Sequence, residues 1–327
     1  MDMLISVLLF AVGLVLLIKG GDWFVDGATG LAKRFRLPDI VVGATVVSIG
    51  TTLPEVMVST TGALAGSGAM AYGNAIGSII CNTALIAAIS ITVNPGPVNV
   101  KSMKTPAIFF FAAAALYCLA AYGLGTFPRW MGFVMLTIFV VYMLLTVRNG
   151  MKNPDTVEEE AEEEGGKERK LWQELLLLVV GAAVIAVGAD LLVEHGQIIA
   201  IGLGVPETVV ALLFVALGTS LPELVTTITS LKKGRASLGV GNVIGANIFN
   251  LVLVSGVAVS LAPFDVPVEN TLLNTGLNLS LVFDIPVMLG VMSLMIFPAM
   301  LGKKLSRWQG VALLCIYLAF VVCQFVL

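Results

Sequence analysis

Long apolar runs separated by short polar segments recur along nearly the whole chain. Each run is at least as long as the roughly 20-residue helix that crosses about 30 Å of hydrocarbon. The first run lacks a basic region and a small-residue cleavage site before Gly20, so we expect a membrane span there and not a signal peptide. The pattern predicts ten spans, numbered in chain order: 3–31, 38–66, 72–93, 105–124, 128–147, 172–200, 206–231, 238–262, 281–302 and 307–326.

Composition supports the same class of protein. Hydrophobic residues make up 58% of the chain and charged residues 12%, and the mean hydropathy is +0.99, which excludes a water-soluble globule. We therefore predict an all-α membrane protein. The four cysteines fall within apolar runs and predict neither disulfides nor a metal site, and the net charge of −3 gives no indication of nucleic-acid binding.

The basic residues predict the topology. If the N-terminus lies outside, all but two of the 18 Lys and Arg residues lie in loops that follow odd-numbered spans, and the exceptions are Lys19 and Arg129. Basic residues resist translocation, so these loops are predicted to be cytoplasmic and both termini to be outside. The acidic segment 148–170, which contains DTVEEEAEEEGGKERK, is then cytoplasmic, and we expect a solvated tether there and not a calcium sensor.

An internal repeat divides the chain. A shift of 168 residues aligns GTTLPE (50–55) with GTSLPE (218–223), and GNAIGSIICN (73–82) with GNVIGANIFN (241–250). This alignment predicts a first five-helix repeat at 1–147, the linker at 148–170 and a second repeat at 171–327. Five is an odd number, so the second repeat enters the bilayer from the opposite side, as in transporters that work by alternating access.

The paired hexads carry the chemistry. A carboxylate within a span is costly and marks a functional cavity, which makes Glu55 and Glu223 the central candidates. Pro54 and Pro222 lack an N–H group, so spans two and seven are predicted to be broken helices with free carbonyl oxygens.

Further oxygen ligands surround these glutamates in the sequence. They are Thr51, Thr52, Ser78, Asn82, Thr219, Ser220 and Asn250. Oxygen ligands of this kind suit Ca²⁺, and Na⁺ could compete for them, whereas Mg²⁺ fits less well. The glycines at 73, 77, 241 and 245 have the spacing of close helix packing, which would bring the amides against the broken spans.

These motifs resemble those of the calcium/cation antiporter superfamily, in particular its prokaryotic sodium/calcium exchanger branch. The resemblance implies a plasma-membrane antiporter with four clustered ion sites, in which spans one and six slide to switch access. It implies that Glu55 and Glu223, with the backbone oxygens of Thr51 and Thr219, bind Ca²⁺. It implies that the sodium sites use the side chains of Thr52, Ser220, Ser78 and Asn82 and the carbonyls of Ser48 and Ala216. Relatives often carry an aspartate where this chain has Asn250 and a serine where it has Ala246.

The sequence therefore predicts a transporter, not an enzyme, that exchanges Ca²⁺ for Na⁺ and needs no cofactor, nucleic acid or obligatory protein partner beyond membrane lipid. A H⁺/Ca²⁺ exchanger stays open because two close carboxylates raise each other's proton affinity, and a passive cation channel is a further alternative. An intramembrane hydrolase is not supported, because the sequence has no HExxH motif. Four acidic residues are predicted either as solvated or capping groups at the outer leaflet edge or as an entry vestibule: Asp22, Asp26, Asp190 and Glu194.

Overall fold

Helices make up nearly all of the structure. The computed structural model describes residues 3–151, 169–203, 218–267 and 277–326. The helices, with π-helical turns labelled η, are α1 Met3–Phe35, α2 Asp39–Val42, η1 Gly43–Val47, α3 Ser48–Leu64, α4 Gly68–Cys81, η2 Asn82–Ala87, α5 Ala88–Val93, α6 Val100–Cys118, η3 Leu119–Leu124, α7 Arg129–Met151, α9 Leu171–Gly202, α11 Leu221–Lys232, α12 Ala236–Phe249, η5 Asn250–Val254, α13 Ser255–Leu261, η7 Ser280–Asp284, α14 Ile285–Gly302 and α15 Arg307–Val326. The short strands are β1 Gly96–Pro97, β2 Thr126–Phe127, β3 Phe264–Asp265 and β4 Lys304–Leu305.

Within the described ranges, nine helical segments are long and apolar enough to cross a membrane. They correspond to nine of the ten predicted spans, so the prediction of an all-α, multi-pass membrane protein is confirmed. The remaining predicted span, 206–231, overlaps residues 204–217, which lie outside the described residues, and its described end is α11.

The two repeats end equivalent helices in the same way. The loop after α3 contains Gly66 with a φ of 85°, and the loop after α11 contains Gly234 with a φ of 70°. These glycines are 168 residues apart, and both adopt the left-handed conformation that ends a helix with little strain. The sequence repeat is therefore also a repeat of local backbone structure.

Two small antiparallel sheets tie the repeats together. Strand β1 pairs with β4, and β2 pairs with β3. Each sheet joins a loop of the first repeat to a loop of the second. The loops joined in each case are predicted from the basic residues to lie on the same side of the membrane, so the pairing agrees with the predicted order of crossings.

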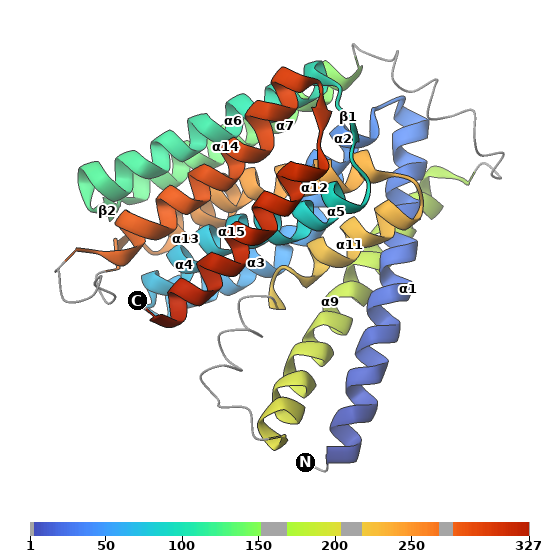
Figure 1. The fold of residues 1–327 in the computed structure, drawn as a ribbon, viewed down its shortest axis with the longest axis horizontal. Helices are drawn as coiled ribbons and strands as arrows, with labels where there is room; N and C mark the ends of the chain where they lie inside the picture. Colours follow the sequence, from blue (N-terminus) through green and yellow to red (C-terminus); the bar gives the residue numbers. More distant parts are fainter. Residues whose placement is uncertain (1–2, 152–168, 204–217, 268–276, 327) are drawn as a thin grey trace.

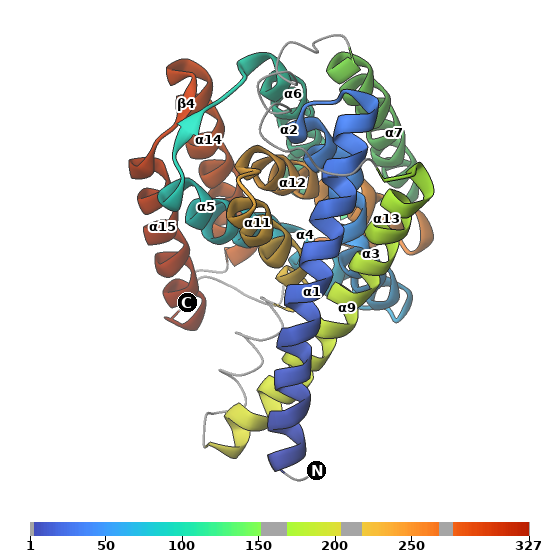
Figure 2. The same ribbon diagram turned by 90° about the vertical axis from the view of Figure 1, so that its right-hand side faces the viewer.

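Helices α1 and α9 form a long pair beside the other helices. In Figures 1 and 2 they run side by side and project beyond the rest of the molecule, with the N-terminus at the free end. Glycines allow the two backbones to approach closely: a Cβ atom added to Gly13 would lie 2.9 Å from the carbonyl oxygen of Gly188, and one on Gly181 would lie 2.6 Å from the backbone nitrogen of Phe24. Close backbone contact of this kind is how helices associate in lipid.

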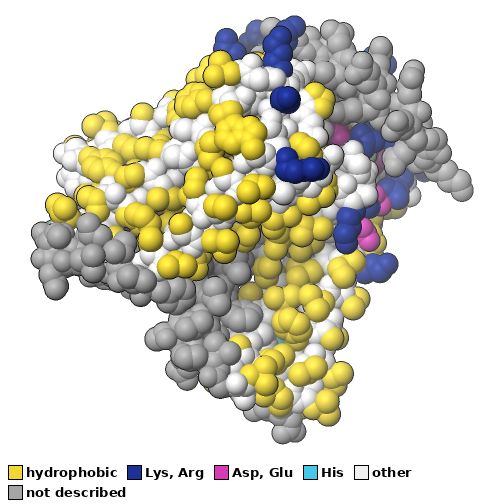
Figure 3. Space-filling model, viewed as in Figure 1, with side chains coloured by type: hydrophobic (Ala, Val, Ile, Leu, Met, Phe, Trp, Pro, Cys, Tyr) yellow, Lys and Arg dark blue, Asp and Glu magenta, His cyan; other side chains and the backbone are white. Residues whose placement is uncertain are grey.

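The surface of the molecule is divided between apolar sides and a basic end. On the face shown in Figure 3, hydrophobic side chains cover the helices, and the Lys and Arg side chains gather toward the end that holds β1 and the C-terminal part of α1. Large apolar side chains are strongly exposed, with Val179 at 68% and Leu301 at 86%. Such exposure is expected where lipid, and not water, surrounds the protein.

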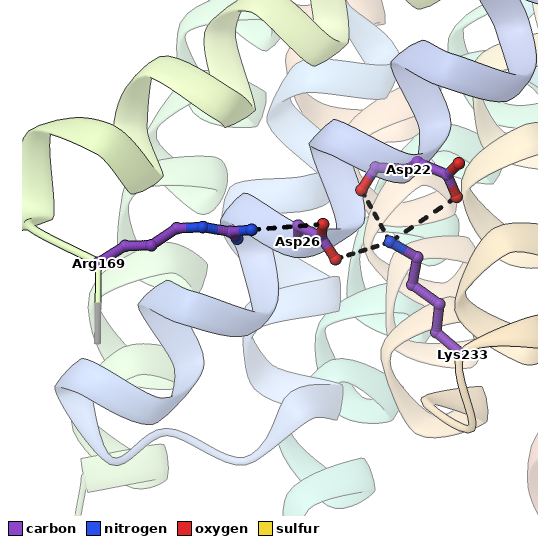
Figure 4. Close-up of polar contacts among 4 residues, drawn as sticks. All are labelled: Asp22, Asp26, Arg169 and Lys233. Atoms are coloured by element: carbon purple, nitrogen blue, oxygen red, sulfur yellow. Dashed lines mark hydrogen bonds and ion pairs between the residues drawn. The ribbon is translucent and has the colours of Figure 1, made fainter. Parts of the chain in front are cut away.

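Charged contacts hold α1 to the loop between α11 and α12. The Lys233 ammonium lies 2.6 Å from Asp26 Oδ1 and 3.7 Å from Asp22 Oδ1, and it donates to the Asp22 carbonyl oxygen at 3.0 Å. Arg169, just before α9, lies 3.8 Å from the other Asp26 oxygen (Figure 4). Lys233 and Arg169 belong to segments predicted to be cytoplasmic. The predicted place of Asp22 and Asp26 at the outer leaflet edge and the predicted cytoplasmic place of these two segments are therefore incompatible with each other.

The Lys233 contacts are expected to contribute modestly to stability. The charged groups involved are about a third exposed, so solvent screens their attraction, and an exposed ion pair contributes about 1 kcal/mol or less. Lys233→Ala is expected to lower the apparent melting temperature in detergent by about 1–3 °C. Asp26→Asn is expected to lower the melting temperature little further when Lys233 is already replaced by alanine. Fully additive effects in this double-mutant cycle would show that the pair contributes nothing.

Candidate functional site

The hexad of the first repeat lies on α3, directly after the π-helical turn η1. Pro54 lies inside α3 and cannot donate to the carbonyl oxygen of Gly50. The structure has one continuous helical segment here, Asp39–Leu64, with the π-helical turn before the hexad and Pro54 inside it, and the free carbonyl oxygens of a broken span two stay a prediction. Such turns widen the helix and occur often at functional sites.

The hexad of the second repeat lies across the start of α11. Gly218, Thr219 and Ser220 precede the helix, which begins at Leu221, with Pro222 in its first turn. Proline is favourable there because the first N–H groups of a helix have no internal partner. The upstream part of predicted span seven, including Ala216, lies outside the described residues.

The two glutamates are completely buried. Glu55 and Glu223 are each 0% exposed, and none of their four carboxylate oxygens has a hydrogen-bond partner among the described residues. The two carboxylates are close enough to interact electrostatically, and Thr51 and Thr52 of the first repeat lie beside Glu223 of the second. A buried carboxylate without a partner is strongly unfavourable unless a cation or a proton neutralises it. The site therefore lies at the interface of the repeats and needs positive charge.

Further buried polar atoms without a hydrogen-bond partner among the described residues occur in the hexads and at the starts of η2 and η5. Asn82 and Asn250 are 0% exposed, both atoms of each amide lack a hydrogen-bond partner, and each asparagine begins a π-helical turn, η2 or η5. The buried hydroxyls of Thr52 and Ser220 are unpaired as well. Buried polar groups are normally hydrogen-bonded, so these unpaired atoms are candidates for ion ligands.

The hydroxyls of Thr51, Thr219 and Ser78, which the sequence singles out, have protein partners, and so does the hydroxyl of Ser48, for which the resemblance implies only a carbonyl ligand. Ser48 Oγ donates to the carbonyl oxygens of Gly43 at 2.8 Å and Asn242 at 2.9 Å. Thr51 Oγ1 donates to Asn242 Oδ1 at 3.1 Å. Thr219 and Ser78 each donate to Asn74 Oδ1, at 3.4 Å and 3.5 Å. These side chains therefore belong to a hydrogen-bond network beside the unpaired oxygens.

Sequence reasoning missed the two asparagines that receive these bonds. Asn74 and Asn242 are the second residues of GNAIG and GNVIG, and the repeat alignment places them at equivalent positions. The signal was visible, because each asparagine recurs at the 168-residue shift. It was not used because the flanking glycines gave a sufficient packing explanation for the motif.

The packing role predicted for the motif glycines holds in the second repeat. A Cβ atom on Gly241 would lie 2.3 Å from the Ile40 carbonyl oxygen, and one on Gly245 would lie 2.7 Å from Ala44 Cα. No described atom lies within 4 Å of a Cβ built on Gly73 or Gly77. The residues equivalent to Ile40 and Ala44 in the second repeat fall within 204–217, outside the described residues.

Helices α1 and α9 cover the hexads from one side. Phe24 of α1 is 2% exposed, and a Cβ atom on Gly50 would lie 2.9 Å from its ring. A Cβ atom on Gly218 would likewise lie 3.0 Å from Cγ2 of Val193, which belongs to α9. A narrow pocket lies between these helices and the hexads, and its lining includes Phe24, Thr51, Pro54, Ala182, Ile185 and Pro222.

The donor set favours a hard cation. Two carboxylates balance one divalent ion, and threonine, serine and asparagine oxygens can complete a flexible shell of about 6–8 ligands, as Ca²⁺ prefers. Among the described residues no group of three or more His, Cys, Asp or Glu side chains could hold a metal ion, and the Cys81 thiol is the sulfur close enough to both glutamates to interact with them electrostatically.

Comparison with known proteins agrees with this chemistry. The family model "Sodium/calcium exchanger protein" matches residues 5–148 and 174–326. The chain is 29% identical to the sodium/calcium exchanger MaX1 of Methanosarcina acetivorans, over 98% of this chain and 99% of that protein. It is 32% identical to an uncharacterized membrane protein of Methanocaldococcus jannaschii, over 94% of both chains.

A solved structure of the sodium-calcium exchanger NCX_Mj, soaked with zero Na⁺ and Ca²⁺, superposes with a TM-score of 0.80 at 29% identity and covers 99% of this chain and 100% of that chain. A second NCX_Mj structure, soaked with 2.5 mM Na⁺ and 10 mM Sr²⁺, gives a TM-score of 0.78. The chain therefore belongs to the sodium/calcium exchanger protein family.

Proposed function

We propose that the protein is a secondary antiporter that exchanges Ca²⁺ for Na⁺ by alternating access. The observation that carries this proposal is the pair of fully buried, unpaired carboxylates of Glu55 and Glu223, one from each repeat, at a single interface. In this proposal one Ca²⁺ binds between the carboxylates and is completed by backbone oxygens of Thr51 and Thr219. Similarity to MaX1 and NCX_Mj, which are sodium/calcium exchangers, supports the choice of ions.

Sodium would use the neighbouring oxygens. The hydroxyls of Thr52 and Ser220 and the amides of Asn82 and Asn250 have no hydrogen-bond partner among the described residues, and in this proposal they supply sodium ligands. The proposed set is completed by the Ser78 hydroxyl and by the carbonyl oxygens of Ser48 and Ala216. Because sodium and calcium would share or border the same carboxylates, sodium binding weakens calcium binding, and exchange follows.

Access would change through α1 and α9. These helices contact each other through glycines, and they cover both hexads through Phe24 and Val193. Close glycine contacts hold the two helices against each other, so they would move as one unit. We propose that the pair moves against the remaining helices and exposes the site to one side of the membrane at a time.

The proposed setting is the plasma membrane, with both termini outside and segment 148–170 in the cytoplasm between repeats 1–147 and 171–327. The distribution of basic residues supports this orientation. The cytoplasmic linker would act as a solvated tether, because its central charges are of one sign.

The function is tested by ⁴⁵Ca²⁺ uptake into proteoliposomes. Uptake is expected to be stimulated by an outward Na⁺ gradient and to stop when both faces hold equal Na⁺, because downhill sodium exit drives calcium entry. Liposomes without protein are the control. Uptake that requires no counter-ion gradient and shows no trans-stimulation would identify a passive channel and contradict the proposal.

A proton-coupled exchanger is the second candidate, and one observation favours it. Relatives often carry an aspartate at the position of Asn250, where this chain has a neutral, fully buried amide. With fewer anionic ligands for sodium, protons on Glu55 and Glu223 could serve as the counter-ions. An outward H⁺ gradient in the same assay, without sodium, separates the two candidates. If calcium uptake is driven by the H⁺ gradient and not by the Na⁺ gradient, the counter-ion is H⁺ and not Na⁺.

A further inference from the structure

Two asparagines outside the proposed ligand set connect the two halves of the site. Asn74 on α4 and Asn242 on α12 occupy equivalent positions in the repeats. Asn242 is fully buried, and Asn74 is partly buried. Neither side chain is used by the proposed ion shells, so their hydrogen bonds call for a separate explanation.

The first set of bonds crosses between the repeats. Thr51 Oγ1 donates to Asn242 Oδ1 at 3.1 Å, and Thr219 Oγ1 donates to Asn74 Oδ1 at 3.4 Å. Each bond joins the threonine of one repeat's hexad to the asparagine of the other repeat. The position of each hexad is thus fixed relative to the opposite repeat, next to the carboxylate it helps to surround.

Asn74 makes a second set of bonds within its own repeat. Its Nδ2 donates to Ser59 Oγ at 2.8 Å and to the Glu55 carbonyl oxygen at 3.3 Å. A carbonyl oxygen can only accept, so the amide nitrogen must face Glu55 and the amide oxygen must face Thr219. One side chain therefore links the helical turn of Glu55 to the segment that precedes Glu223. We call the contact of Asn74 with Ser59 and Glu55 the inner bridge of the first repeat.

The equivalent inner bridge of the second repeat is open. The residue equivalent to Ser59 is Thr227, which is 1% exposed on α11. Asn242 Nδ2 and Thr227 Oγ1 are both buried and have no hydrogen-bond partner in the part of the chain that the structure describes. The helices still touch here, since a Cβ atom on Gly239 would lie 3.2 Å from Thr227 Cα. A donor and an acceptor in adjacent helices are thus unpaired in this conformation, which leaves a bond for another conformation to form.

We infer that Asn74 and Asn242 are positioning residues whose inner bridges alternate during transport. The bridge of Asn74 with Ser59 and Glu55 is closed in this conformation, and the bridge of Asn242 with Thr227 closes when the site faces the other side of the membrane. Inverted repeats switch access by changing places in conformation, so a contact present in one repeat and absent in its equivalent marks a part that moves. The inference rests on the proposed function, because it requires a site with two access states.

Thr227→Val in the full-length protein tests the inference, because valine keeps the shape of threonine and removes the hydroxyl. We expect ⁴⁵Ca²⁺ exchange in proteoliposomes to slow about tenfold, the rate equivalent of one lost hydrogen bond, with equilibrium ⁴⁵Ca²⁺ binding to the purified protein changed less than about twofold. Thr227→Ser restores a hydroxyl and is expected to restore the rate. A merely structural role would instead lower binding and rate together.

Ser59→Ala is the matched variant, because it removes the bond that exists in this conformation. The two variants should bias the conformational equilibrium in opposite directions. Hydrogen–deuterium exchange of α3 and α11 in the ion-free protein is therefore expected to shift oppositely in Thr227→Val and Ser59→Ala. Shifts in the same direction, or a wild-type exchange rate in Thr227→Val, would overturn the inference.

The outcomes also separate this inference from the proposed function. A wild-type protein that binds no Ca²⁺ would refute the function, while the deuterium-exchange comparison, which needs no transport, would still decide whether the bridges alternate. Thr227→Ala takes the place of Thr227→Val in both assays if the valine variant does not elute as a single species.

Discussion

Glu55→Gln and Glu223→Gln are each expected to reduce calcium exchange by at least about 100-fold. Glutamine has nearly the shape of glutamate but carries no charge, and its amide nitrogen repels a cation. Removal of one partner from a buried pair of opposite charges, here the carboxylate that faces the bound cation, costs about 3–5 kcal/mol. A cost of about 2.7 kcal/mol already corresponds to a 100-fold change in rate or affinity. The measurement is ⁴⁵Ca²⁺ exchange in proteoliposomes together with equilibrium binding to the purified protein.

The same variants are expected to fold at least as well as the wild type when no ion is present. Glu55 and Glu223 are buried, close together and unpaired, so removal of one charge relieves both repulsion and desolvation. Calcium should raise the melting temperature of the wild type but not of the variants. This comparison distinguishes a lost ligand from a damaged fold.

Asp284→Asn provides the matched control. Asp284 is also a carboxylate within a span, but its Oδ1 accepts a hydrogen bond from Gln324 at 2.7 Å. Asparagine keeps an acceptor at this position, so exchange is expected to remain within about twofold of wild type. Full activity in either glutamate variant, or equal loss in Asp284→Asn, would contradict the assignment of the site.

Gly241→Ala is expected to have the largest effect on stability. A Cβ atom there would lie 2.3 Å from the carbonyl oxygen of Ile40 and 2.9 Å from its Cα, so backbone atoms of α2 would have to move away from α12. Overpacking of this kind typically costs about 1–3 kcal/mol or more. The expected result is a lower melting temperature in detergent and a lower yield of monodisperse protein.

Gly302→Ala is the control for helix propensity. Gly302 ends α14, and the nearest described atom to a Cβ there is Lys304 Cγ at 3.9 Å, an ordinary contact. Its melting temperature is expected to match or slightly exceed that of the wild type. If Gly241→Ala and Gly302→Ala melt at the same temperature, α2 and α12 are not packed as closely as the structure indicates.

The spans and the glutamates were accessible from the sequence because each leaves a local signal. A run of some 20 apolar residues can be stable only in lipid or in a core, so nine predicted spans recur as helices in the described residues. A carboxylate inside such a run is a candidate for a site, and Glu55 and Glu223 are fully buried, although Asp284 shows that the same signal also occurs outside the proposed site.

The contacts of Asp22, Asp26, Asn74 and Asn242 were not accessible in this way. Asp26 meets Lys233 across 207 positions of sequence, and Thr51 meets Asn242 across 191. Residue type indicates that such side chains need partners but not which partner is near. That choice depends on how each helix is rotated and how the repeats are docked.

The sequence by itself determined the membrane class, the duplication and the two glutamates, since hydropathy, periodic repetition and the cost of buried charge are properties of local segments. Only the tertiary structure decided which oxygens stay unpaired around Glu55 and Glu223 and which are held by Asn74 and Asn242. Those bonds join separate repeats, and their geometry exists only after the helices have packed. The same packing leaves Asn242 and Thr227 unpaired while Asn74 and Ser59 are bonded, an asymmetry that two nearly identical motifs could not reveal.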